Sequence, residues 1–205
     1  MFTMPSKLLF LPGAMGAPQF WSPVATRLSH PAAKACLGWP GFGATPPDPD
    51  INGIDDLVTM VVSNIDQPTV LIAQSMGGII AIRAALEKRD LVTHLVLAAT
   101  SGGIDMSSHA THDWRPTFRE ENPLLPPWFC LYQEDLEAEL HKLHMPTLLL
   151  WGDADPISPV SVGKHLASLL PWTELRVIPG GDHGFASTRA DEIAPLIDKH
   201  LATSR

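Results

Sequence analysis

One serine stands where a run of strand-forming residues passes directly into a helical pattern. Residues 69–73 form the apolar run, Ser75 follows it, and two glycines come next at 77 and 78. On such a sharp strand-to-helix turn, a nucleophile elbow, the serine hydroxyl is exposed above the sheet, and the strained backbone needs small neighbours. Ala73 and Gly77 meet that need. The pattern therefore favours Ser75 as a nucleophile that attacks a carbonyl carbon.

A base and an acid for this serine are available at the ends of two later apolar runs. A serine hydroxyl is a weak nucleophile at neutral pH, so it needs a general base and a group that orients the base. His183 follows the run 175–178 as the candidate base, and the run 148–151 precedes Asp153 and Asp155. Asp182, beside His183, is a further candidate for the acid. The carboxyl ends of parallel strands share one edge of a sheet, where ligands bind, so these loops are expected to meet.

The elements that must position these residues alternate along the chain. Short apolar runs predict strands near 7–11, 33–37, 69–74, 94–100, 147–151 and 174–178, and helical patterns lie near 17–29, 54–66, 76–89, 131–143, 160–170 and 187–202. Such alternation predicts an α/β fold with a parallel sheet and helices on both faces. Several runs are apolar at every position, as strands covered on both sides must be.

Segment 104–130 interrupts this alternation. It is rich in prolines and polar residues, with aromatic side chains interspersed. A loop of this length in a compact domain is usually functional, often as a lid. We expect a cap here that packs on the sheet through its aromatic side chains, some of which also line a substrate pocket. The candidate substrate-binding residues are Met15, Trp114, Trp128 and Phe129, with Phe118 as a further packing residue.

Taken together, these motifs resemble those of the α/β-hydrolase fold superfamily, from about residue 7 to residue 202. The order Ser, Asp, His is that of the superfamily. Its Gly-x-x-Asp and Gly-x-x-His turns match Gly152 with Asp155 and Gly180 with His183, so the resemblance favours Asp155 as the acid. Some relatives place the acid after the fourth strand, which makes Asp105 an alternative. A length of 205 residues suits a single domain, expected over residues 1–205. The implied architecture is about six parallel strands in the order 2-1-3-4-5-6, with a short cap at about 104–130, after the fourth strand.

The resemblance further implies two backbone donors for the oxyanion that forms during attack. The N–H group of Met76 is one candidate. The loop 12–16 is similar to the His-Gly loop of the superfamily, with Pro12 in place of the histidine. Proline has no N–H group. We therefore expect the second donor to be Ala14, with Met15 as the alternative.

Composition narrows the possible partners and the compartment. A net charge of −8 without any basic run disfavours nucleic acid and anionic membrane surfaces. The apolar run 8–11 ends at Pro12-Gly13, too soon for a secretion signal, and no run is long enough to span a membrane. Cys36 and Cys130 are interpreted as buried thiols, so a cytoplasmic protein is expected.

The function expected from these residues is that of a serine hydrolase. It would cleave a carboxylic ester, lactone or thioester of small to medium size through an acyl-enzyme, and this cycle needs no cofactor. The pairs His109/His112 and His141/His144 have a spacing that suits a metal, but neither has a second ligand cluster, so no metal is expected. The same triad could serve a lyase, a C–C hydrolase or an acyltransferase, and a ligand-binding protein without turnover is a further alternative.

Overall fold

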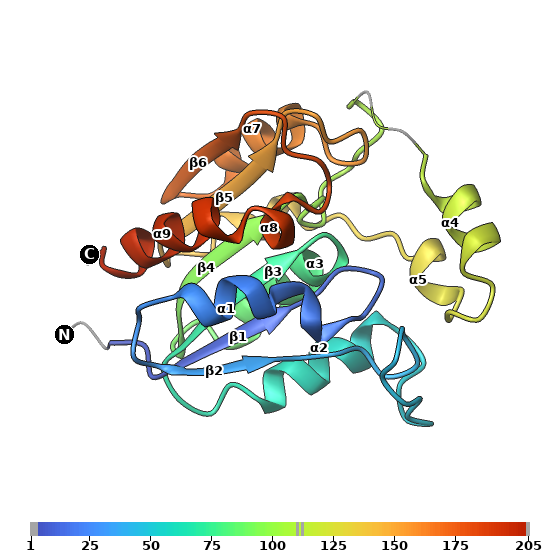
Figure 1. The fold of residues 1–205 in the computed structure, drawn as a ribbon, viewed down its shortest axis with the longest axis horizontal. Coiled ribbons are helices and arrows are strands. Elements are labelled where there is room, and N and C mark those ends of the chain that lie inside the picture. Colours follow the sequence, from blue (N-terminus) through green and yellow to red (C-terminus); the bar gives the residue numbers. More distant parts are fainter. Residues whose placement is uncertain (1–3, 110, 112, 204–205) are drawn as a thin grey trace.

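A parallel sheet of six strands forms the centre of the molecule (Figure 1). The computed structural model describes residues 4–109, 111 and 113–203. The strands are β1 (Lys7–Leu11), β2 (Ala33–Cys36), β3 (Thr69–Gln74), β4 (Val92–Ala98), β5 (Thr147–Gly152) and β6 (Thr173–Ile178). They lie in the order β2-β1-β3-β4-β5-β6, and every neighbouring pair is parallel. The predicted α/β fold and strand order are therefore confirmed.

Helices cover both faces of this sheet. Leu9, Leu71 and Leu97 belong to the core on one face, formed with α2 (Ile54–Ser63), α3 (Met76–Glu87) and α7 (Val160–Leu169). Their strand neighbours Leu8 and Val70 belong to the core on the other face, formed with η1 (Pro18–Trp21), α1 (Ser22–Arg27), α8 (Phe185–Thr188) and α9 (Ala190–Leu201). Because successive strand residues point to opposite faces, two covered faces require strands that are apolar throughout. In the described part of the chain, no helix has both the length and the apolar character needed to cross a membrane.

The connection between β4 and β5 carries the segment 104–130, which we call the cap segment. It contains α4 (Arg115–Glu121) and most of α5 (Trp128–Leu131), and both helices lie on the side toward which the arrows of β1 and β2 point in Figure 1. The cap segment is thus placed beyond the carboxyl ends of these strands. This is the edge of a parallel sheet at which ligands bind.

The helix predicted over 131–143 is wrong. The chain instead ends α5 at Leu131 and forms one further short helix, α6 (Glu137–Leu140). Between them Leu136 donates its N–H to the carbonyl oxygen of Gly103 at 2.8 Å, and its side chain lies so close that a Cβ on Gly103 would be 2.6 Å from it. This long-range packing outweighs the local helical preference of the segment.

The two cysteines are free thiols in different environments. Cys130 is buried in the core, whereas Cys36 is only half-buried at the end of β2, so the expectation of a buried Cys36 is wrong. Burial raises the pKa of both thiols above the ordinary value.

Candidate active site

The turn between β3 and α3 holds Ser75 in a backbone conformation that is rare for a residue other than glycine. Its φ is 53° and its ψ is −123°. The helix that follows lies directly against the end of β1, and a Cβ on Gly77 would be 2.5 Å from the carbonyl oxygen of Pro12 and 2.7 Å from that of Leu11. Glycine at 77 is therefore required by this close approach. Strain of this kind is typical of functional turns.

His183 lies between Ser75 and Asp155. Its Nε2 is 3.0 Å from Ser75 Oγ, and its Nδ1 is 2.8 Å from Asp155 Oδ2. A carboxylate only accepts hydrogen bonds, so Nδ1 carries the proton and Nε2 is free to accept the Ser75 hydroxyl. The Asp155 side chain is fully buried, and its Oδ1 accepts N–H groups of Ile157 and Ser158 at 2.8 and 3.2 Å. The carboxylate is thus held rigidly and all its partners are supplied by the protein.

The other candidate acids have different hydrogen-bond partners. Asp153 Oδ1 accepts the N–H of Gly180 at 2.5 Å, and Asp182 Oδ1 accepts the N–H of Gly184 at 2.9 Å. Asp105 accepts both the N–H and the hydroxyl of Ser107, and these bonds hold the pKa of its carboxyl below the ordinary value. Asp182 and Asp105 thus shape their own loops, whereas Asp153 joins the loop after β5 to the turn after β6. Of the four candidates, Asp155 is the one that contacts the imidazole.

The loop after β1 brings Ala14 to the nucleophile. Ala14 and Met76 line the same cavity as Ser75. In the described part of the chain, neither the N–H of Ala14 nor that of Met76 donates a hydrogen bond, so both remain available. The loop itself is fixed by the indole N–H of Trp39, which lies 3.0 Å from the carbonyl oxygen of Pro12. An oxyanion hole needs two such donors, and these two N–H groups are candidates for that role.

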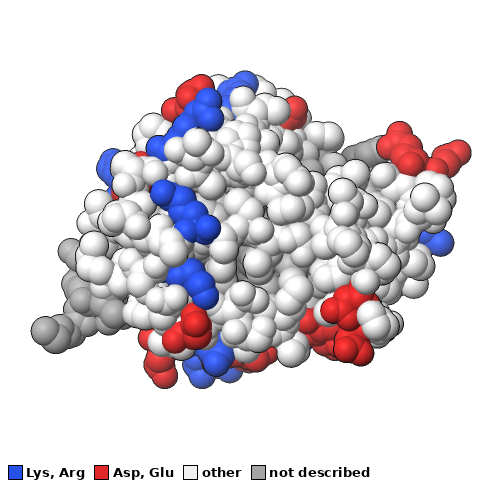
Figure 2. All heavy atoms as spheres, turned by 60° about the horizontal axis from the view of Figure 1, so that its bottom comes forward, with Lys and Arg blue, Asp and Glu red and all other residues white. Residues whose placement is uncertain are grey.

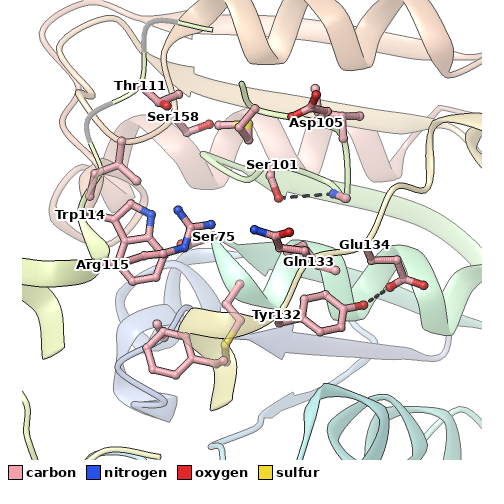
Figure 3. A pocket seen from close by; sticks show the side chains of 18 of the residues that line it. Ser75, Ser101, Asp105, Thr111, Trp114, Arg115, Tyr132, Gln133, Glu134 and Ser158 are labelled. Atoms are coloured by element: carbon pink, nitrogen blue, oxygen red, sulfur yellow. Dashed lines mark hydrogen bonds between the residues drawn. The ribbon is translucent and has the colours of Figure 1, made fainter. Parts of the chain in front are cut away.

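A cavity of about 590 Å³ opens above Ser75 and His183. Such a volume suits a small or medium-sized ligand. Figure 3 shows Trp114 and Arg115 on one side of Ser75, and Tyr132, Gln133 and Glu134 on the other. The cap segment and the residues that follow it thus supply two of its walls.

The four candidate substrate-binding residues differ in their positions. Trp114 and Phe129 line the cavity, and their rings stack with centroids 5.9 Å apart. Trp128 packs edge-to-face on Phe42 at 5.4 Å and is not among the residues that line the cavity. Met15 is 52% exposed and likewise lies outside the cavity lining. The structure therefore brings two of these four side chains to the site.

Three polar residues next to the site have roles that the sequence analysis did not assign. Gln74 is buried, and its Nε2 donates to the carbonyl oxygen of His183 at 3.1 Å. Thr100 and Ser158 are also buried and connect the turns that carry Ser75 and Asp155. Gln74 is adjacent to Ser75, Ser158 lies three residues after Asp155, and Thr100 lies two residues after the end of β4. That proximity is the signal that could have found them.

Metal ligation has little support in the described part of the chain. No group of three or more His, Cys, Asp or Glu side chains in residues 4–109, 111 and 113–203 could hold an ion. Nε2 of His109 lies 3.3 Å from Nδ1 of His165. His112, the other histidine of the predicted pair, lies outside the described residues.

Comparison with known proteins identifies the family. Residues 8–129 match the profile of the alpha/beta hydrolase family, and the chain belongs to this family. Over 66 residues the chain is 44% identical to a poly(3-hydroxyalkanoate) depolymerase of Ectopseudomonas oleovorans, a match that covers 32% of the chain and 23% of the depolymerase. It is 24% identical over 224 residues to a pimeloyl-[acyl-carrier protein] methyl ester esterase of Chromobacterium violaceum, with 88% of each protein covered. The first of these matches therefore spans about a quarter of its relative's length.

Solved structures have the same fold. An esterase from Exiguobacterium antarcticum superposes with a TM-score of 0.82 over 98% of this chain and 94% of its own, at 15% sequence identity. An esterase from Thermogutta terrifontis superposes with a TM-score of 0.76 over 95% and 89% of the two chains, at 19% identity. At these identities the likeness establishes the fold.

Proposed function

We propose that the protein is a serine hydrolase that cleaves carboxylic esters through an acyl-enzyme, with Ser75, His183 and Asp155 as its catalytic triad. The observation that carries the proposal is the continuous hydrogen-bonded chain from Ser75 Oγ through the imidazole to Asp155, with distances of 3.0 and 2.8 Å. The esterase-like relatives agree with this chemistry. Lactones and thioesters undergo the same acyl transfer and are included in the proposed substrate class.

In the first half of the cycle, Ser75 Oγ attacks the carbonyl carbon and its proton passes to His183 Nε2. The oxyanion accepts hydrogen bonds from the N–H groups of Met76 and Ala14. Asp155 keeps the imidazole in the reactive tautomer and stabilises its cation. The tetrahedral intermediate then breaks its bond to the alcohol, which leaves with the proton from His183. In the second half, His183 takes a proton from water as the water attacks the acyl carbon. The second tetrahedral intermediate then breaks its bond to Ser75 Oγ, which regains the proton from His183, and the carboxylic acid is released.

A fluorophosphonate probe together with a panel of short and medium acyl esters tests this proposal. We expect the probe to label the wild-type protein and not Ser75→Ala. Ester turnover should fall by about 10⁴-fold in Ser75→Ala and in His183→Ala, because residues of a triad act as a unit. Circular dichroism of both variants serves as the control for folding.

Two outcomes would contradict the assignment. Ester turnover by Ser75→Ala at a rate similar to that of the wild type would show that Ser75 is not the nucleophile. A wild-type protein that reacts with the probe but hydrolyses no ester, lactone or thioester would exclude ester hydrolysis. That second result would favour a lyase, a C–C hydrolase, an acyltransferase or a ligand-binding role.

A further inference from the structure

One guanidinium group faces the cavity above the candidate nucleophile. Arg115 is the first residue of α4 and lines the same cavity as Ser75 and His183. In the described part of the lining it is the one Lys or Arg side chain. Figure 3 shows its guanidinium turned from α4 toward the centre of the cavity, beside the ring of Trp114. A permanent positive charge is thus present in the wall of a site built for acyl transfer.

The protein holds this guanidinium in place from behind. Its Nε donates to the carbonyl oxygen of Cys130 at 3.2 Å, and its Cζ lies 5.3 Å from the centroid of the Trp114 ring. A planar guanidinium held by one hydrogen bond and a stacked ring retains its terminal nitrogens for a ligand. Because this hydrogen bond and this ring contact already restrict the Arg115 side chain, less side-chain entropy is lost when a ligand binds.

The terminal nitrogens have only a weak protein partner. Nη1 lies 3.5 Å from Asp113 Oδ1, and both side chains are well exposed, at 45% and 66%. An ion pair of this kind contributes about 0–1 kcal/mol. Among the described residues, no other acceptor is paired with these nitrogens. A ligand carboxylate could therefore replace or join Asp113 at little cost.

The acidic residues in the cavity wall have partners of their own. Asp105 accepts from Ser107, and Asp135 accepts the N–H of Glu137. Glu134 pairs with Tyr132 and lies 3.6 Å from Arg83. The cap end of the molecule is nevertheless rich in acidic side chains, which gather at the right end of the face in Figure 2. Their long-range field favours a cation, whereas direct contact with Arg115 favours an anion.

We propose that Arg115 binds a free carboxylate that the ester substrate carries at a distance from the scissile bond. The guanidinium fork matches a carboxylate with two parallel N–H···O bonds. Half-esters of dicarboxylic acids, with the ester at Ser75 and the acid at Arg115, are therefore the preferred substrate class. This inference rests on the proposed function, because it assigns a substrate to the same site.

Three matched ester series test the inference. The substrates are monomethyl esters of C4 to C8 dicarboxylic acids, methyl esters of monocarboxylic acids of equal length, and methyl esters of ω-amino acids of equal length. The enzymes are the wild type, Arg115→Gln, Arg115→Lys and the matched control Arg119→Gln. Arg119 is an exposed arginine of the same helix and lies outside the lining of the cavity.

We expect wild-type kcat/KM to be at least about 10-fold higher for the best half-ester than for its neutral counterpart. A charge-assisted contact commonly has an effect of this size. Arg115→Gln should bring this ratio close to one, mainly through KM, and Arg115→Lys should restore part of it. Arg119→Gln should leave the ratio unchanged. The preference should also weaken as salt is added, because the contact is partly exposed.

Equal rates for charged and neutral esters, or a preference for the ammonium series, would overturn the inference. If Arg119→Gln lowers the preference for half-esters as much as Arg115→Gln does, the preference comes from the general electrostatic field. That result would also overturn the inference. If no ester is hydrolysed, the proposed function fails. Calorimetric titration of Ser75→Ala with monomethyl glutarate then tests carboxylate binding at Arg115 independently of catalysis. Binding that disappears in Ser75→Ala/Arg115→Gln supports the carboxylate site, and absence of binding to Ser75→Ala excludes it.

Discussion

Thr100 Oγ1 donates a hydrogen bond of 2.6 Å to the carbonyl oxygen of Ser75. The carbonyl oxygen of Thr100 in turn accepts the hydroxyl of Ser158 at 3.2 Å, and the N–H of Ser158 donates to Asp155 at 3.2 Å. Thr100 and Ser158 are 1% and 2% exposed. These bonds join the turns after β3, β4 and β5, so one buried network positions both Ser75 and Asp155.

Thr100→Val removes the hydroxyl from this network with little change in shape. The carbonyl of Ser75 keeps only its bond from the N–H of Gly78, and the N–H of Gly102 loses its acceptor. We expect the free energy of unfolding to fall by about 1–3 kcal/mol, and kcat to fall about 10-fold as the turn loosens. Urea denaturation and ester kinetics measure the two effects. Thr93→Val, whose hydroxyl bonds to Thr69 at the far end of the sheet, should leave kcat unchanged.

Asp155→Asn should distinguish the proposed catalytic acid from the nearby aspartates. An amide at this position can present its NH₂ group to His183 and stabilise the wrong imidazole tautomer, so kcat should fall by about 10⁴-fold. Asp182→Asn is the matched control, because Asp182 is adjacent to His183 and only accepts the N–H of Gly184. Its kcat should stay within about 3-fold of the wild type, since an amide oxygen accepts the same bond. Comparable losses in the two variants would argue against Asp155.

Gly77→Ala should disturb the packing of α3 on the loop after β1. The added Cβ would be 2.5 Å from a carbonyl oxygen, too close for any side chain, so the backbone must move. We expect a loss of at least about 2 kcal/mol in the free energy of unfolding, together with lower esterase activity. At Gly53 nothing lies within 4 Å of an added Cβ. Gly53→Ala should therefore change the free energy of unfolding by less than about 1 kcal/mol in denaturation experiments.

Acid should destabilise the protein through a buried histidine pair. His94 and His200 are each 4% exposed, and their ring centroids are 5.3 Å apart. Burial, followed by the charge of His94, lowers the pKa of His200 to about 4, and burial also lowers the pKa of His94. Between pH 6.5, the ordinary histidine value, and pH 4, the unfolded chain takes up a proton that the folded chain does not. The free energy of unfolding therefore falls as the pH falls through this window, by about 3 kcal/mol at pH 4 for His200.

Urea midpoints measured from pH 7 to pH 4 check this prediction. His200→Leu should flatten the decline, and His144→Gln, at an exposed position, should not change it. If the stability of His200→Leu declines as steeply as that of the wild type, the acid sensitivity does not come from His200.

Several features of the site could be predicted from the sequence because they depend on local chemistry. Buried strands must be apolar, and the turn at Ser75 needs small neighbours, so both leave a pattern over a few residues. The helix predicted over 131–143 fails for the opposite reason. There the carbonyl of Gly103 captures the N–H of Leu136, a contact between segments that local preferences do not register.

By itself, the sequence determined the α/β architecture and the residues able to act as nucleophile, base and acid, since apolar periodicity and turn chemistry are encoded within short stretches. Tertiary structure decided which aspartate contacts His183, which aromatic residues reach the cavity and where the guanidinium of Arg115 points. These outcomes depend on distances between segments that lie tens of residues apart. Such distances are set only when the sheet has formed and its faces are packed.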